Sequence, residues 1–534
     1  MSGERPKSGR TKDSDSGSVT SLAAVKEQRL NYGRLPKPDK GTVPYANCRE
    51  ELAGLTLGDK VIIATQTDAW TRLMVPILDE LEADRPRKGP APAYTSHELE
   101  LAVLFTRMAG KERYAEARAL LAGDRGGCDR RTLGFDRPRQ RVGRNLRVVK
   151  SLDGVPSEKT VWRHLDRFGL DRHAAIYEEL LFPAIVAEHF ENFPEAMAAE
   201  SRVVDFDGSA ILSHYSSFER KNRKTGEVKP PTLSGGGFRP RTDSNAGKDG
   251  HGVMLSAGLT STGLPLVARI EKLNESEGGI VASMLREDWR ESIAPHIELT
   301  DEKFGVMAFD AAICGITVRT AVHEAGYIPT CHPVSHALRE RSKRNARAHD
   351  KYTWAIEGKP GWKANGHREV MCAHGTPATK KDFRRKKGGE AVARIEGSCS
   401  KGCGHISITA GEWRAAQNPK RFVRVMPGEE DRADWKMGNP LTFNSKVSES
   451  YGTARFGHNE GFHGALVTRF GLLKEKTWRR SRAHVQRDFF QTFFIMHALA
   501  MEQRRRAAAK ATASTPAVAG GAPTPPLASA AWRS

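Results

Sequence analysis

The chain contains few of the residues that stabilise secreted or membrane-bound proteins. Its 534 residues include only 7 cysteines, an odd number spread along the sequence, which argues against a disulfide framework. No stretch approaches the roughly 20 apolar residues of a membrane-spanning helix, and the first residues lack the apolar core of a secretory signal. These absences predict a cytoplasmic protein with reduced thiols and no membrane partner.

Acidic residues are scarce relative to basic ones. Lys and Arg number 84 against 64 for Asp and Glu, a formal net charge of +20. Such an excess favours a polyanionic partner, DNA or RNA, although a solvated basic surface is the alternative. Residues 1–40 and 504–534 show no hydrophobic period, and we expect a disordered basic tail and a disordered Ala/Pro tail there.

Residues 41–195 are predicted to form a helical DNA-binding region. Apolar residues recur at helical spacing, and Ser157 is a plausible N-cap for a helix that places Val161, Leu165 and Phe168 on one face. Arg163 and Arg167 lie off that face, as in the second helix of a helix-turn-helix, which reads the major groove. A plain packing helix is the alternative interpretation.

Strand patterns begin near residue 200. The segment "RVVDFD" predicts a strand, "HGVMLSAGLTSTGLPLVARI" predicts a hairpin that turns at 260–263, and "FGVMAFD" starts a strand, helix, strand unit. The fold class predicted is therefore α/β. We expect its core in two parts, 196–338 and 446–503, separated by a strand-rich insertion over 339–445.

Asp207 and Asp310 are expected at the carboxyl ends of strands, where active groups gather in open α/β sheets. Two neighbouring carboxylates repel each other unless a cation joins them, and Mg²⁺ takes hard oxygen ligands of this kind. Two such ions can activate a nucleophile and stabilise the leaving oxygen of a phosphodiester. A turn or cap role is the alternative for any single aspartate.

The order of these motifs resembles the DDE transposases of bacterial insertion sequences: an Asp in "DGS", a hairpin, an Asp in "FDAAICG", then Tyr, Arg and Glu near a C-terminal helix. The resemblance implies a ribonuclease H-like core preceded by a helix-turn-helix-type domain. It also implies that Asp207, Asp310 and Glu460 are catalytic and bind Mg²⁺ or Mn²⁺, and that Tyr451 and Arg455 belong to a region that contacts DNA.

Two assignments stay open, because Asp205 competes with Asp207 for the first acid and Glu449 competes with Glu460 for the third. The function expected from the resemblance is metal-dependent DNA cleavage and strand transfer. Its partners would be double-stranded DNA at the element ends and at the target, with a homo-oligomer on that DNA and a nucleoid-associated location. The alternatives are a non-catalytic DNA-binding regulator or transposase remnant, and a nuclease that cuts without joining.

The insertion contains two close groups of zinc-type ligands. Cys372 and His374 form the first, and Cys399 and Cys403 form the second, with His405 as a substitute. Such pairs, separated by a loop, could converge on one tetrahedral structural Zn²⁺. Reduced cysteines without metal are the alternative.

Overall fold

The computed structural model describes residues 52–85, 93–123, 126–137, 139–142, 148–152, 154–221, 227–241, 249–299, 305–310, 313, 316–331, 353–356, 359, 361–365, 370–374, 376–385, 391–409, 422–424, 446–473 and 476–514. The predicted basic tail at 1–40 lies outside these ranges. No helix in the described part is long and apolar enough to cross a bilayer.

The first part of the chain is mostly helical, as predicted. Its elements are α2 (Leu57–Thr65), η3 (Trp70–Met74), α3 (Val75–Ala83), α4 (Ser96–Met108), α5 (Tyr114–Ala122), α6 (Gly127–Thr132), α7 (Glu158–Phe168), α8 (Leu170–Ala175), η5 (Ile176–Leu181), α9 (Phe182–Asn192) and α10 (Pro194–Glu200). Ser157 caps α7 as predicted, since its side chain accepts from the Thr160 N–H. Local signals were therefore sufficient to predict helix α7 and its N-cap.

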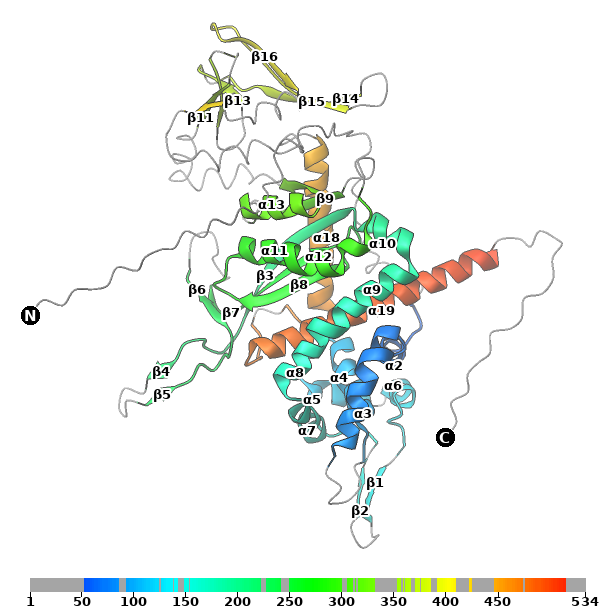
Figure 1. Cartoon of the computed structure of the whole chain (residues 1–534). Helices are drawn as coiled ribbons and strands as arrows, with labels where there is room; N and C mark the ends of the chain where they lie inside the picture. The colour runs from blue at the N-terminus through cyan, green and yellow to red at the C-terminus, as the bar shows by residue number, and fades with distance from the viewer. Residues whose placement is uncertain are drawn as a thin grey trace, which may run out of the picture.

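One hairpin interrupts the helices, and it was not predicted from the sequence. Strands β1 (Arg139–Val142) and β2 (Val148–Leu152) pair antiparallel and extend from the helical region at its lower end (Figure 1). Both strands are short, and basic residues break any clean alternation, so the period of two was not detectable.

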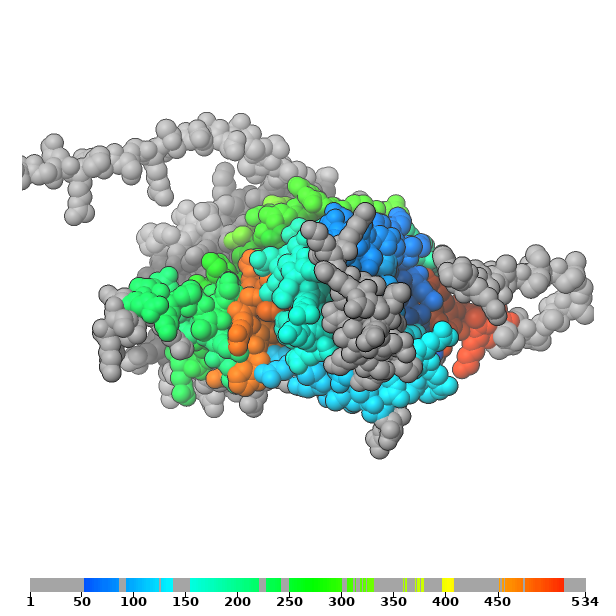
Figure 2. All heavy atoms as spheres, turned by 90° about the horizontal axis from the view of Figure 1, so that it is seen from below, coloured from blue at the N-terminus to red at the C-terminus, as the bar shows by residue number. Residues whose placement is uncertain are grey.

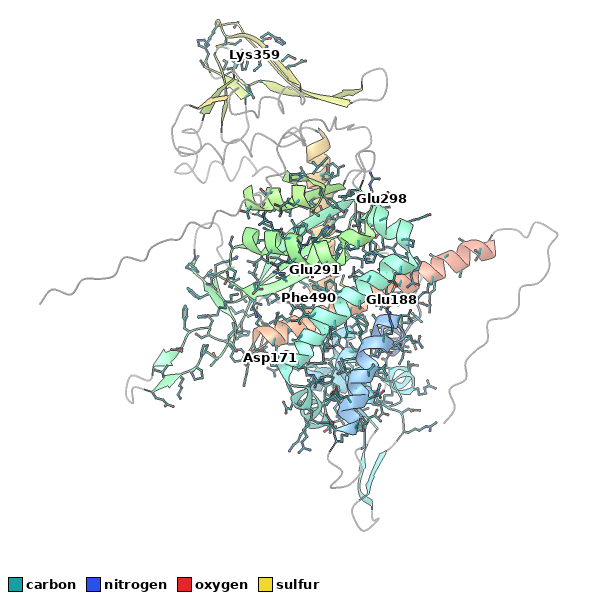
Figure 3. All side chains as sticks on the ribbon, in the orientation of Figure 1. Asp171, Glu188, Glu291, Glu298, Lys359 and Phe490 are labelled. Carbon is teal, nitrogen blue, oxygen red and sulfur yellow. The ribbon has the colours of Figure 1, made fainter. Side chains whose placement is uncertain are left out.

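The long C-terminal helix α19 (Arg482–Ser514) joins the helical region to the rest of the molecule. It packs against α2, α4, α8 and α9, and Figure 2 shows the blue-to-cyan helices gathered beside the orange-to-red C-terminal segments. Phe490 of α19 lies 5.3 Å from Phe182 of α9 between ring centroids, and Figure 3 labels Phe490 there. A single hydrophobic cluster runs from Leu52 to Met501.

Helix α19 also corrects the predicted start of the C-terminal tail at 504. The helix continues to Ser514, and Arg504 forms an ion pair with Glu200 at 2.7 Å. Arg506 pairs with Glu502 one turn away, again at 2.7 Å. The alanine-rich composition read as low complexity is also strongly helix-forming, and these ion pairs favour the helix.

A mixed sheet forms the centre of the second part. Its strands are β3 (Val203–Leu212), β6 (Gly237–Arg239), β7 (Gly250–Leu259), β8 (Pro265–Lys272), β9 (Gly305–Phe309) and β10 (Tyr327–Cys331). The order is β10-β9-β3-β7-β6, with β8 also paired to β7. Strands β3, β7 and β8 run antiparallel in succession, whereas β9 and β10 run parallel to β3. The predicted hairpin is confirmed, and its turn contains Gly263 at φ +78°.

Helices cover both faces of this sheet. The crossover from β8 to β9 contains α11 (Glu277–Met284), η6 (Leu285–Trp289), α12 (Arg290–Ser292) and η7 (Ala294–His296), and the crossover from β9 to β10 is α13 (Ile316–Glu324). Helix α18 (Lys446–Thr468) contacts β3, β9 and β10. Gly208 faces α11, because Glu277 Oε1 lies 1.8 Å from where a Cβ on that glycine would be. Its neighbour Asp207 therefore points to the opposite face, toward α18.

The remaining strands form small sheets outside this core. They are β4 (Arg220–Lys221), β5 (Val228–Lys229), β11 (Thr353–Ile356), β12 (Trp362–Asn365), β13 (Val370–Cys372), β14 (Thr379–Arg385), β15 (Ala391–Cys399), β16 (Gly404–Thr409) and β17 (Phe422–Arg424). Those after residue 350 make a four-stranded sheet, β13-β12-β11-β17, and a three-stranded sheet, β14-β15-β16. The insertion is thus strand-rich in its described part, as predicted.

Candidate functional site

One face of β3 has polar side chains against helix α18. Side chains alternate along a strand, so Asp205, Asp207 and Ser209 share the face that α18 covers. The Oγ of Ser209 lies 3.0 Å from Nε2 of His463. Strand and helix therefore meet through hydrogen-bonding and charged groups, which is unusual for a sheet–helix contact and marks this face as a candidate site.

Asp205 is fully buried and already has a partner. Its side chain and that of His458 are both 0% exposed, and His458 Nδ1 contacts Asp205 Oδ2. Burial raises the pKa of Asp205, and His458 acts in the opposite direction. Because Asp205 has no access to solvent, the geometry favours Asp207 as the acid that could meet a ligand.

Asp207 lies nearer the rim of the same face. Its side chain is 23% exposed, with Arg455 Nη1 at 3.6 Å and His463 Nδ1 at 3.7 Å from its carboxyl oxygens. Burial raises the pKa of Asp207; His463 and Arg455 lower it, and Asp310 raises it further. Asp207 lies within β3 rather than at its carboxyl end, which corrects the sequence interpretation. The parallel pairing with β9 does end nearby, at Asp205.

Asp310 follows the last residue of β9 and is exposed. The parallel pairing of β3 with β9 ends at Asp205 and Ala308, so Asp207 and Asp310 each lie two residues beyond the same end of that pairing. The two acids are also close enough to interact, because the Asp310 charge raises the pKa of Asp207. The structure therefore brings together two of the three predicted acids.

Glu460 is not brought into contact with this pair. It lies on α18, one turn before His463, and is exposed. Within the described residues, the one group of three or more His, Cys, Asp or Glu side chains arranged to hold a metal lies elsewhere. Glu449, the alternative third acid, lies in the first turn of the same helix, but its side chain lies outside the described ones.

The two histidines beside the aspartates were missed by sequence reasoning. His458 and His463 lie in "GHNEGFHG", and together with Arg455 they form the helix face that meets β3. Their spacing from Arg455, three and eight residues, is the helical period that could have indicated a shared face.

The predicted DNA contacts on α18 need correction. The Tyr451 side chain is 1% exposed, and that of Arg455 is directed at Asp207 instead of outward. On α7, Arg163 and Arg167 are both exposed, but Arg167 also donates to the carbonyl oxygen of Leu81 on α3. Arg163 is therefore the predicted contact that is most available to DNA.

The predicted Cys/His ligands do converge. The ligand atoms of Cys372, His374, Cys399 and Cys403 all lie within 4.8 Å of one another. His405 is not in the group, because its Nδ1 lies 3.0 Å from the Ser398 hydroxyl.

Comparison with known proteins gives little. No family model matches the chain, and no curated protein matches it. Among solved structures, the chain is similar to one described as "Mos1 transposase paired-end complex with left transposon end", at 12% identity, with 54% of this chain and 76% of that chain covered and a TM-score of 0.15. A likeness at this score carries no argument about fold or function.

Proposed function

We propose that the protein is a DNA transposase whose sheet carries a two-carboxylate metal site. The observation that carries the proposal is the proximity of Asp207 and Asp310, each two residues beyond the last parallel pair of β3 and β9, with Asp207 on the face that α18 covers. Two carboxylates this close, one exposed and one at the rim, repel each other electrostatically unless a cation or a nearby positive charge balances their charges.

The topology supports a ribonuclease H-like core. An antiparallel succession β3, β7 and β8 is continued by two strands parallel to β3, with helical crossovers through α11 and α13. The last helix of the core, α18, covers the face that bears the acids. This is the arrangement that the resemblance to DDE transposases led us to expect.

The donor set fits a hard divalent cation. Asp207 and Asp310 offer carboxylate oxygens, the ligands that Mg²⁺ and Mn²⁺ prefer. Glu460 does not contact the pair, and our proposal assigns it as the third ligand from the resemblance to DDE transposases and from its place on α18, the helix that covers the acids. Mg²⁺ bound there would supply an activated water and stabilise the leaving oxygen of a phosphodiester.

The chain's own residues orient the acids. Arg455 and His463 approach Asp207 from α18 and fix where its carboxylate lies, while the Asp205–His458 pair attaches the same helix deeper on β3. A surplus of positive charge, +20 over the whole chain, would favour binding of DNA close to these acids. Element ends would be recognised by the helical region, where Arg163 is exposed on α7. Two ends held together would require a homo-oligomer.

The test uses labelled DNA ends taken from the sequence that flanks the gene, mixed with the full chain, Mg²⁺ and a supercoiled plasmid target. A transposase yields joined product. Nicking or cutting without joining would instead make the protein a nuclease, and a gel shift without cleavage would make it a DNA-binding regulator or a transposase remnant.

A further inference from the structure

We propose that Cys372, His374, Cys399 and Cys403 form a structural Zn²⁺ site. This site is separate from the carboxylates of the proposed transposase site, and the inference does not depend on that function. The four side chains come from two different sheets: Cys372 ends β13, whereas Cys399 ends β15 and Cys403 lies in the turn before β16. One bound ion would therefore connect the two sheets of the insertion.

The distances match a tetrahedral zinc centre. Nδ1 of His374 lies 3.2 Å from Sγ of Cys403 and 3.6 Å from Sγ of Cys399, and all four ligand atoms lie within 4.8 Å of one another. Zn–S bonds of about 2.3 Å and Zn–N bonds of about 2.0 Å place neighbouring ligand atoms of a tetrahedron roughly 3.5 to 3.8 Å apart. Small movements of side chains would then suffice to coordinate the ion.

The surrounding backbone holds the ligands in these positions. The N–H of Thr376 donates to Cys372 Sγ at 3.3 Å, and the N–H groups of Lys401 and Cys403 donate to the Cys399 sulfur. Donors of this kind stabilise thiolates and orient metal ligands. The turn that carries Cys403 has Gly402 at φ +101°, a conformation that favours glycine.

Trp362 fixes the Cys403 turn against β12. Its side chain is 1% exposed, and its Nε1 donates to the carbonyl oxygen of Cys403 at 3.0 Å. Gly361 leaves room for the thiol, because a Cβ there would lie 2.7 Å from Cys403 Sγ. The carbonyl oxygen of Lys359, a residue labelled in Figure 3, accepts from the Trp362 N–H just before β12. These contacts hold the Cys403 turn next to β12 without a bound ion.

The chemistry of the donors selects the metal. Three thiolates and one imidazole suit borderline Zn²⁺ and do not suit Mg²⁺, which requires oxygen ligands. With four protein ligands the coordination shell is closed, as in structural rather than catalytic zinc sites. The insertion's small sheets lie outside the main hydrophobic cluster, so an ion here would supply stability that apolar burial does not.

The test is metal analysis of the full chain purified under reducing conditions without added metal. We expect about one zinc per chain, and loss of that zinc in Cys399→Ser and in Cys403→Ser. The matched control is Cys128→Ser, since Cys128 is an exposed free cysteine on α6, and this variant should keep its zinc.

A second measurement remains decisive if the serine variants fail to fold. Wild-type protein is stripped with a chelator and titrated with Co²⁺, which should give the thiolate charge-transfer and tetrahedral d–d absorption bands at one equivalent, and added Zn²⁺ should abolish them. A chain without zinc that gives no such bands, zinc retained in both serine variants, or a disulfide among these cysteines found by mass spectrometry would each overturn the proposal.

Discussion

Removal of the His458 side chain is expected to destabilise the protein strongly, although it removes none of the proposed metal ligands. The imidazole and the Asp205 carboxyl are both 0% exposed, and Asp205 Oδ1 is buried with no hydrogen-bond partner among the described residues. His458→Ala would leave this carboxyl without its buried partner. Breaking a buried pair from one side costs about 3–5 kcal/mol.

The loss should depend on pH. Burial already raises the pKa of Asp205, and removal of its partner would raise it further. A carboxyl whose folded-state pKa lies above its unfolded value stabilises the fold below the unfolded value and loses that contribution as pH rises through the folded one. His458→Ala should therefore be most destabilised at neutral pH, and the double variant with Asp205→Asn should recover much of the loss.

Urea denaturation of the wild type and variants, followed by tryptophan fluorescence at pH 5 and pH 7.5, measures these differences. The control is His463→Ala, because that side chain is 26% exposed and contacts Asp207 at the rim, so its removal should cost about 0–1 kcal/mol. A His458→Ala variant within about 1 kcal/mol of wild type at pH 7.5 would refute the assignment of a buried pair.

Three further predictions test other parts of the structure. Asp488→Asn should lower the free energy of unfolding in urea by about 3–5 kcal/mol, because Arg107, Arg479 and Arg487 all pair with this buried carboxylate. The control Glu80→Gln, in an exposed pair, should lower it by less than about 1 kcal/mol. Burial raises the pKa of Glu178 to about 7, so the stability that this carboxyl contributes is lost as pH rises from 4.5 through 7. Glu178→Gln should therefore stabilise the protein by up to roughly 3 kcal/mol at pH 8 and have little effect at pH 4.5. Equal effects at the two pH values would contradict the burial argument. Arg163→Ala should weaken binding to element ends and reduce the slope of log affinity against log salt by about 1; an unchanged slope with an unchanged melting temperature would make α7 a packing helix.

Short-range patterns predicted most of the elements around the site. The strand that contains Asp207, the hairpin after it, and the strand, helix, strand unit around Asp310 follow from alternation, helical period and glycine at turns. The N-cap of α7 was equally local. These signals act over a few residues, so one sequence is sufficient to detect them.

Pairings between distant residues could not be predicted in the same way. His458 meets Asp205 across 253 positions, and Tyr451 is buried although its motif suggested a contact with DNA. Helix α18 mixes small, polar and aromatic residues and has no clear apolar stripe. The face of this helix that packs on the sheet is therefore decided by the tertiary fold and could not be predicted from its sequence. The Cys/His group could be predicted because each of its pairs is close in sequence.

In the proposed function, Asp207 and Asp310 hold the metal for phosphodiester cleavage. The most direct measurement is the cleavage rate of labelled element ends in Mg²⁺ by Asp310→Asn, with Asp171→Asn on the exposed surface of α8 as the matched control. Asp171, labelled in Figure 3, lies on the helical region and not on the sheet. We expect Asp310→Asn to keep its DNA affinity and melting temperature but to cleave more than about 100-fold more slowly, a larger loss than mutations of residues that only support metal ligands produce. The control should cleave at the wild-type rate. Cleavage by Asp310→Asn at the wild-type rate would contradict a metal-binding role for Asp310.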